Sequence, residues 1–189
     1  LNIILAGFSD AAVTVLGLYY KMQSFFFIPL FGLQTCIVPV LSYNYTCKYY
    51  ERCKKIMTDT FLISGSFMLL GIFCFTVLPA QLVKIFSQSE EVIKIGSVAF
   101  PIIGSSFLPA TFSLMMPVFF QAIGAGKRSV FLSLLRQIFC LVPIFRAFSF
   151  IGLDYTWISF PVSETLSGGV GVIMYLAELK KWGVLKKNS

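Results

Sequence analysis

Long apolar runs alternate with short polar segments along the chain. A helix needs about 20 apolar residues to cross about 30 Å of hydrocarbon. Five runs exceed that length, at residues 22–45, 61–83, 95–126, 129–153 and 155–177. The first three hold no charged residue, whereas the fourth holds Arg136 and Arg146 and the fifth holds Glu164. The pattern predicts an all-α fold, a bundle of transmembrane helices.

Residues 1–6 are too few to cross a membrane. We expect them to be the end of a sixth helix, cut off by the start of the sequence. The sequence begins at Leu1, without an initiator Met or a signal-peptide pattern. It is therefore expected to be a fragment of a longer chain.

Basic residues gather in three of the polar segments. With five spans, the segments around Lys48 and Lys127 and the C-terminal tail share one side of the membrane. They carry ten basic residues: Lys48, Arg52, Lys54, Lys55, Lys127, Arg128, Lys180, Lys181, Lys186 and Lys187. The opposite segments have only Lys84 and Lys94 nearby. Because Lys and Arg mark the cytoplasmic side, we predict a cytoplasmic C-terminus.

All eight prolines lie in the apolar runs or at their ends. Proline inside a helix removes a hydrogen bond and bends the axis, and transporters often use bent helices to open and close a cavity. A static kink is the alternative. Pro79 is expected to end the second span. The candidates for hinges are Pro29, Pro109, Pro117 and Pro161.

Composition supports a lipid environment. Hydrophobic residues make up 57% of the 189 residues and charged residues only 12%, about half the share in soluble proteins. The net charge of +7 is explained by membrane orientation, so no nucleic-acid partner is expected. The five cysteines are interpreted as reduced packing residues. Without histidine or a CxxC pair, no metal or other cofactor is expected, and no motif indicates an enzyme.

Ionisable residues inside a span are functional candidates because they are costly there. Glu164 lies about ten residues in from Asp154, near mid-membrane at about 1.5 Å per residue. It could exchange a proton, hold Na⁺, face a cationic substrate or form a structural ion pair. Lys21, which precedes Gln23, could extend to the interface or pair with Glu164.

For two arginines, Arg136 and Arg146, a structural role is expected more than a functional one. Arg136 lies about two turns in from the loop at Lys127. It could extend to the interface or join neighbouring helices by donating to carbonyls freed by proline. Arg146 lies near the outer end of its span and is expected to extend to the interface.

Several short motifs resemble the multidrug and toxic compound extrusion (MATE) family. In order along the chain they are Lys21-Met-Gln-Ser-Phe, Ile28-Pro-Leu-Phe-Gly-Leu-Gln, Pro39-Val-Leu-Ser-Tyr-Asn-Tyr, Phe120-Gln-Ala-Ile-Gly, Gly126-Lys-Arg-Ser, Leu135-Arg-Gln, Val142-Pro-Ile and Trp157-Ile-Ser-Phe-Pro-Val-Ser-Glu. The resemblance covers nearly the whole chain and is closest to the MepA-like and DinF-like bacterial branches. Glu164 matches a position where the family often has an acidic residue, and Lys21 and Gln23 match a polar patch.

The resemblance implies the C-terminal half of a twelve-helix transporter with two six-helix lobes. The expected helices are residues 1–6 (the end of helix 7), 11–45, 52–83, 92–124, 128–150 and 155–180 (helices 8 to 12). Such proteins export organic cations and other drugs in exchange for H⁺ or Na⁺ by alternating access. The implied partners are cationic or amphipathic drugs, the lipid bilayer and an N-terminal six-helix lobe, in a bacterial plasma membrane.

Two departures and two alternatives accompany this resemblance. Thr46 stands where the family usually has glycine, and the third run has none of the acidic residues that some branches use for coupling. One alternative is a lipid-linked oligosaccharide flippase of the same superfamily, favoured by Lys21, Arg136 and Arg146 but not by Glu164. The other is a non-transporting membrane subunit or truncated product.

Overall fold

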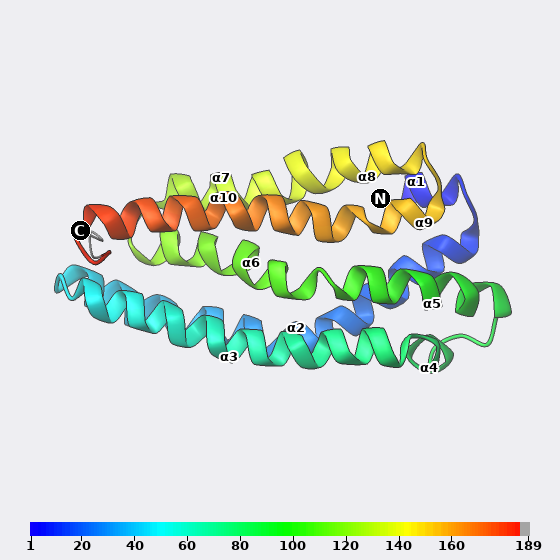
Figure 1. Ribbon diagram of the computed structural model, residues 1–189, viewed down its shortest axis with the longest axis horizontal. Helices are drawn as coiled ribbons and strands as arrows, with labels where there is room; N and C mark the ends of the chain where they lie inside the picture. Colours follow the sequence, from blue (N-terminus) through cyan, green and yellow to red (C-terminus); the bar gives the residue numbers. More distant parts are fainter. Residues whose placement is uncertain (186–189) are drawn as a thin grey trace.

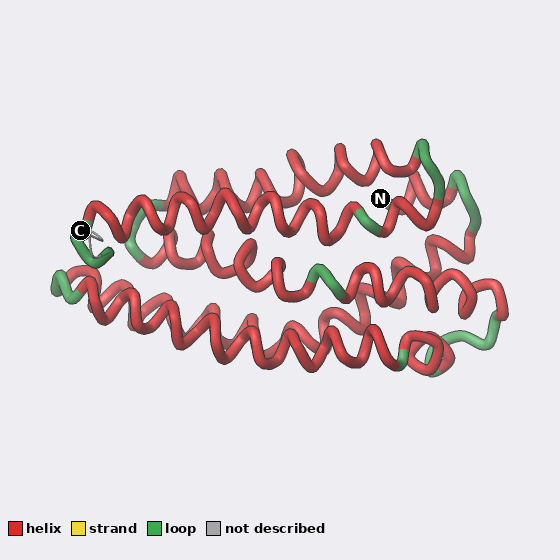
Figure 2. The backbone as a smooth tube through the Cα atoms, viewed as in Figure 1, coloured by secondary structure: helices red, strands yellow, loops and turns green. Residues whose placement is uncertain are grey.

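The computed structural model describes residues 1–185, which form an elongated helical bundle (Figures 1 and 2). After the short helix α1 (Asn2–Ala6), the described chain passes five times along the bundle in alternating directions. α2 (Asp10–Thr46) is the first pass and α3 (Tyr50–Val77) the second. The all-α membrane bundle expected from the sequence is confirmed.

α2 begins at a capped end. The Ser9 side chain accepts a hydrogen bond from the amide of Ala12 at 3.1 Å, and Asp10 in the first turn favours the positive end of the helix dipole. The helix ends at Thr46, and the next turn places Lys48 at a φ of 60°. Thr46 is itself helical, so the left-handed position of this turn falls on Lys48 and not on the position where the family usually has glycine.

The second pass is shorter than expected. α3 ends at Val77, and Pro79 opens a separate short helix, α4 (Pro79–Lys84). Proline fits the first turn of a helix, because the amide hydrogens at these positions have no acceptor within the helix and none is lost. Pro79 therefore ends the second span as predicted, but the expected helix of residues 52–83 is two helices.

The third pass is bent. α5 (Glu90–Gly104) and α6 (Phe107–Ala122) meet at an angle of 52°, where a continuous helix over residues 92–124 was expected. The ring of a proline collides with the carbonyl four residues before it, and for Pro109 that residue is Ser105, in the break. Pro109 thus ends one helix and opens the next, whereas Pro117 lies inside the continuous α6.

The fourth pass contains a wide turn. It consists of α7 (Gly126–Leu134), the π-helix η1 (Leu135–Leu141) and α8 (Val142–Ser149). A π-helix bonds each amide to the carbonyl five residues back and is often found at functional sites. Pro143 follows it and lacks an amide hydrogen, so the regular hydrogen-bond pattern is already interrupted here. The sequence did not predict this π-helix.

The fifth pass is also interrupted just before a proline. α9 (Leu153–Trp157) and α10 (Ser159–Lys181) are separated at Ile158, and the residue four before Pro161 is Trp157. α10 packs closely on α6. A Cβ added at Gly171 would lie 2.8 Å from the Met116 side chain, which is too close for a side chain without rearrangement.

The two ends of the bundle differ in charge. The turn at Lys48, the turn before α7 and the end of α10 lie at one end (left in Figure 1), and α1, α4 and the turn between α8 and α9 lie at the other. The three basic segments therefore share one end. Lys186 and Lys187 of the predicted basic tail lie outside the described residues.

Length and composition support most of the expected crossings. Three helical segments of the described chain are long and apolar enough to cross a membrane: Asp10–Thr46, Tyr50–Val77 and Gly126–Ser149. The bent pair of α5 and α6 makes a fourth if it counts as one span. α10 is not among them, although its 23 residues run beside α6. It contains the charged residue Glu164 and ends in Glu178, Lys180 and Lys181.

Candidate functional site

A buried ion pair links the last two passes of the bundle. Arg136 on η1 donates to Glu164 on α10 through both Nε and Nη2, with Nη2 2.6 Å from Oε1 and Nε 2.9 Å from Oε2. The Glu164 side chain is 8% exposed and that of Arg136 is 22% exposed. Two parallel hydrogen bonds fix the guanidinium in the plane of the carboxylate. Removing either partner of such a pair typically costs about 3–5 kcal/mol.

A third helix completes the environment of Glu164. The hydroxyl of Ser113 on α6 donates a hydrogen bond to Oε2 of Glu164, and the carbonyl oxygen of Ala110 lies 3.1 Å from the same hydroxyl. Ser113 is buried. Both carboxylate oxygens therefore have charged or neutral donors, which lowers the cost of the buried charge. Sequence reasoning missed Ser113, since nothing in the chain shows which helix packs against α10.

The ion pair lies in the wall of a cavity of about 290 Å³. Aromatic side chains make up a large part of the rest of the wall: Tyr19, Tyr20, Phe27, Phe31 and Phe160. Polar groups on α2 and η1 add Gln23, Ser24 and Gln137. Ring faces attract cations, so this wall combines a carboxylate with surfaces that suit a flat organic cation.

A smaller hollow adjoins this cavity. Arg136 and Leu114 also line a hollow of about 220 Å³, whose polar lining includes Ser129, Ser133, Gln34 and Gln121. Gln34 donates to the carbonyl of Leu114 at 3.2 Å and so connects α2 to α6 near Pro117. Sequence reasoning missed Gln34 as well.

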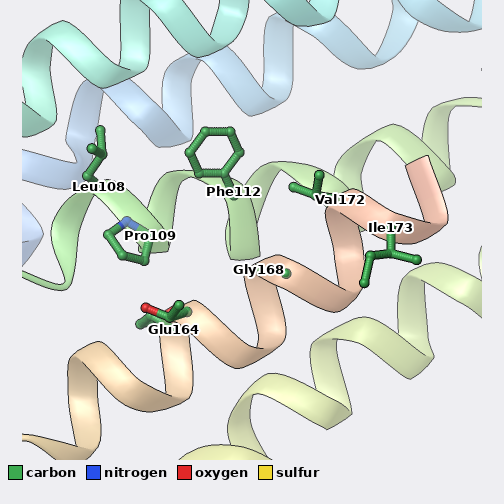
Figure 3. A pocket seen from close by; sticks show the side chains of 9 residues that line it. Leu108, Pro109, Phe112, Glu164, Gly168, Val172 and Ile173 are labelled. Carbon is green, nitrogen blue, oxygen red and sulfur yellow. The ribbon is translucent and has the colours of Figure 1, made fainter. Parts of the chain in front are cut away.

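Glu164 also borders an apolar groove on another side of α10. Figure 3 shows Leu108, Pro109 and Phe112 of α6 opposite Gly168, Val172 and Ile173 of α10. The groove has a volume of about 550 Å³ and is almost entirely apolar. It is larger than the aromatic cavity, but it offers few groups that could recognise a charged molecule. The aromatic cavity is therefore the better candidate site.

The structure brings together some of the predicted residues and separates others. Glu164, Arg136 and Gln23 line the same cavity. Lys21 is exposed on α2 and does not pair with Glu164, because Arg136 occupies the carboxylate. Arg136 donates to that carboxylate, and not to carbonyls freed by proline. Arg146 is exposed, with its guanidinium 4.8 Å from the centre of the Phe150 ring.

The four proline candidates have different positions. Pro29 and Pro117 lie inside α2 and α6. Pro109 and Pro161 lie in the first turns of α6 and α10, so they mark breaks between helices and not kinks within one. Pro109 and Glu164 line the same groove (Figure 3).

The cysteines are free thiols but do not all pack. Cys53 and Cys140 are buried, Cys74 is partly buried, and Cys36 and Cys47 are exposed. The expectation of five packing residues is therefore wrong for Cys36 and Cys47, which lie on the surface of α2 and at its end.

A second ion pair closes the basic end of the bundle. Arg128 on α7 binds Glu178 on α10 at 2.7 Å, and Lys181 lies 3.3 Å from the same carboxylate oxygen. Glu178 follows the apolar run that ends at residue 177. Partial burial alone would raise the pKa of Glu178, but the hydrogen bonds from Arg128 and Lys181 outweigh it and hold the pKa below its usual value.

The family follows from a match over most of the chain. The model of the MatE family matches residues 1–145. The chain belongs to the MatE family. Among curated MatE-like proteins, the multidrug export protein MepA of Staphylococcus saprophyticus is 23% identical over 177 residues, which are 93% of this chain and 39% of MepA. MepA of Staphylococcus aureus is 19% identical over 177 residues, which are also 93% of this chain and 39% of that MepA.

Solved MatE structures have the same fold. The outward-facing conformation of a multidrug resistance MATE family transporter of the MOP superfamily matches 96% of this chain and 41% of its own, with a TM-score of 0.87 and 19% identity. A MOP superfamily transporter from Pyrococcus furiosus with a binding pocket of reversed polarity matches the same shares with a TM-score of 0.86. This MatE chain therefore spans about two fifths of the proteins it matches.

Proposed function

We propose that this MatE chain is the C-terminal lobe of a secondary antiporter that exports drugs or organic cations in exchange for H⁺ or Na⁺. The observation that carries the proposal is the Arg136–Glu164 pair in the wall of the aromatic cavity. A buried charged pair is expensive to keep within a membrane, which argues for a use beyond anchoring. Multidrug export by the MepA relatives supports the same substrate class.

The irregular backbone around the pair supports alternating access. Glu164 follows the break at Ile158, Arg136 lies in the π-helix, and Ser113 follows the break between α5 and α6. Helix breaks give a bundle places where one segment can tilt against another. The cation-binding carboxylate and its partners would move with these segments.

The remaining features of the proposal concern the whole transporter. The substrates are cationic or amphipathic drugs, the coupling ion is H⁺ or Na⁺, and no other cofactor takes part. The working partners are the bilayer and an N-terminal six-helix lobe. The protein lies in the bacterial plasma membrane with the basic end of the bundle and the C-terminus in the cytoplasm, as the positive-inside rule predicts.

The flippase alternative receives less support from the geometry. Such a protein needs free basic groups in its cavity for an anionic headgroup. Arg136 is already paired with Glu164, and Lys21 and Arg146 are not among the residues that line the aromatic cavity.

Efflux from cells tests the proposal. The complete gene is expressed in a host without its own efflux pumps, and the export of ethidium is followed with and without a Na⁺ or proton gradient. We expect export that stops when the coupling gradient is collapsed. The control is Ser66→Leu, a change on an exposed site of α3. Ethidium retention that is equal with and without the protein would contradict the proposal.

A further inference from the structure

The two side chains of the ion pair have unequal surroundings. Glu164 is held by Ser113 and lies between the aromatic cavity and the groove. Arg136 lies instead between the aromatic cavity and the smaller hollow beyond it. The carboxylate therefore has a second donor in Ser113, whereas the guanidinium borders a second space that it could enter.

That second space suits a guanidinium. Its polar lining includes Gln34, Gln121, Ser129 and Ser133, whose oxygens can accept hydrogen bonds. It has a volume of about 220 Å³ and adjoins the side chain of Arg136. A guanidinium that left Glu164 for this hollow would lose its carboxylate partner but keep hydrogen-bond acceptors, which lowers the cost of its departure.

The aromatic cavity offers matching features to an incoming cation. Tyr20 and Phe31 line this cavity and are 42% and 47% exposed, so their rings are available for stacking. Phe160 and the buried Tyr19 also line it and pack edge to face at 5.2 Å. A flat aromatic cation could stack on the exposed rings and bring its positive charge to Glu164. Arg136 already occupies that carboxylate, so the two cations compete for it.

Resting on the proposed export function, we propose that Arg136 is a built-in competitor, a tethered cation that a flat aromatic cation displaces from Glu164 into the neighbouring polar hollow. The site is never an unpaired anion in this scheme. One cation replaces another at the carboxylate, so Glu164 stays paired, and the displaced guanidinium carries its own positive charge into the hollow. A non-cationic aromatic molecule cannot replace the guanidinium and is excluded.

Affinity measurements on the purified complete protein test this scheme. The fluorescence anisotropy of ethidium reports binding without any transport. Arg136→Ala removes the tethered competitor. We expect ethidium to bind at least about fivefold more tightly, because Glu164 is then free in every molecule and ethidium no longer has to displace the guanidinium first. Glu164→Gln is expected to weaken binding by a similar factor or more. A purely structural pair predicts that both changes weaken binding together, and that result would overturn the scheme.

A second variant keeps the test decisive if Arg136→Ala does not fold. Ser133→Leu fills the hollow that the displaced guanidinium needs, yet Ser133 does not line the aromatic cavity. We expect ethidium affinity to fall severalfold. The matched control is Ser66→Leu, since both serines are exposed and each donates to the carbonyl four residues before it. Equal ethidium affinity in Ser133→Leu and Ser66→Leu would overturn the scheme.

The failure of the scheme and that of the proposed function have different signatures. If the unmodified protein exports and binds ethidium but Arg136→Ala does not tighten binding, the competitor role alone is wrong. If the unmodified protein neither binds nor exports ethidium, the proposed function is wrong and the competitor role is wrong with it.

Discussion

The carboxylate of Glu164 accepts hydrogen bonds from two other helices, and the hydroxyl of Ser113 is the one that can be removed without disturbing charge. Ser113→Ala leaves Arg136 as the remaining side-chain donor to Glu164 in the described structure. A hydrogen bond to a charged group contributes about 1.5–3 kcal/mol. We expect a loss of unfolding free energy in this range and slower ethidium export, measured by thermal unfolding and efflux.

Ser167→Ala is the matched control for Ser113→Ala. Ser167 is also buried, but its hydroxyl donates within its own helix α10, to the carbonyl of Ser163 at 2.8 Å. We expect a smaller loss of stability and unchanged efflux. Equal effects of the two substitutions would show that the contact between Ser113 and Glu164 has no special role.

At the residue scale, the sequence singled out the charged residues of the cavity wall but not the side chains that they contact. Glu164 and Arg136 stand out in the sequence because ionisable groups are rare inside apolar runs. Lys21 was the residue named as a possible partner of Glu164, whereas the packing of η1 on α10 makes Arg136 the partner. Ser113 is an ordinary residue on a helix and gives no signal until the neighbouring helix is known.

At the scale of helices, two glycines of α10 have different surroundings: Gly171 is closely packed, whereas Gly169 faces open space. A Cβ at Gly171 would meet the Met116 side chain at 2.8 Å, whereas one at Gly169 meets nothing within 4 Å. Gly171→Ala should cost about 1–3 kcal/mol through overpacking. Gly169→Ala should be neutral or stabilising by up to about 1 kcal/mol, because alanine favours helix more than glycine does. Thermal unfolding of both variants measures the difference, and a neutral Gly171→Ala would contradict the close packing of α10 on α6.

The bend of the third pass should depend on Pro109. Pro109→Ala restores an amide hydrogen for the carbonyl of Ser105 and removes the collision of the ring, so we expect the angle of 52° between α5 and α6 to decrease. The distance between spin labels at Glu91 and Gln121 should therefore lengthen. Pro101→Ala, within the continuous α5, serves as the control and should leave the distance unchanged. An unchanged distance in Pro109→Ala would mean that tertiary packing, and not the proline, fixes the bend.

The sequence predicted helices better than it predicted their interruptions. The apolar runs and polar turns located every pass, because hydrophobic length is a strong signal. Pro109 and Pro161 were expected to kink their helices, yet each lies in the first turn after a break. The π-helix around Arg136 has no comparable signature, since its hydrogen-bond shift depends on the helices packed against it.

At the scale of the whole molecule, the two ends of the bundle should face opposite sides of the membrane. Single cysteines at Lys48 and Asp154 report this, in a protein whose native cysteines, including the five of this chain, are replaced. We expect an impermeant thiol reagent to label Asp154→Cys in intact cells and Lys48→Cys only after permeabilisation. Labelling of Lys48→Cys in intact cells would reverse the proposed orientation.

The basic end should also show a dependence on pH. Because the pKa of Glu178 is lowered in the folded protein, its stabilising effect is present above the unfolded pKa of about 4.3 and is lost as the pH falls through the folded pKa. Glu178→Gln should reduce stability by about 0.5–1 kcal/mol at neutral pH. The difference from the unmodified protein should vanish in acid, as measured by thermal unfolding. A difference that persisted in acid would assign the effect to packing instead of charge.

The Arg136–Glu164 pair also constrains how the protein is made. Glu164 follows Arg136 by 28 residues, so a ribosome delivers the arginine to the membrane while its partner is still being synthesised. A lone arginine at the centre of an inserting helix costs about 2.5–3.5 kcal/mol. The fourth pass therefore gains its full stability in the bilayer only when the fifth arrives, and the two are best inserted together as a hairpin. The same pair that lines the aromatic cavity thus couples the membrane insertion of the fourth and fifth passes.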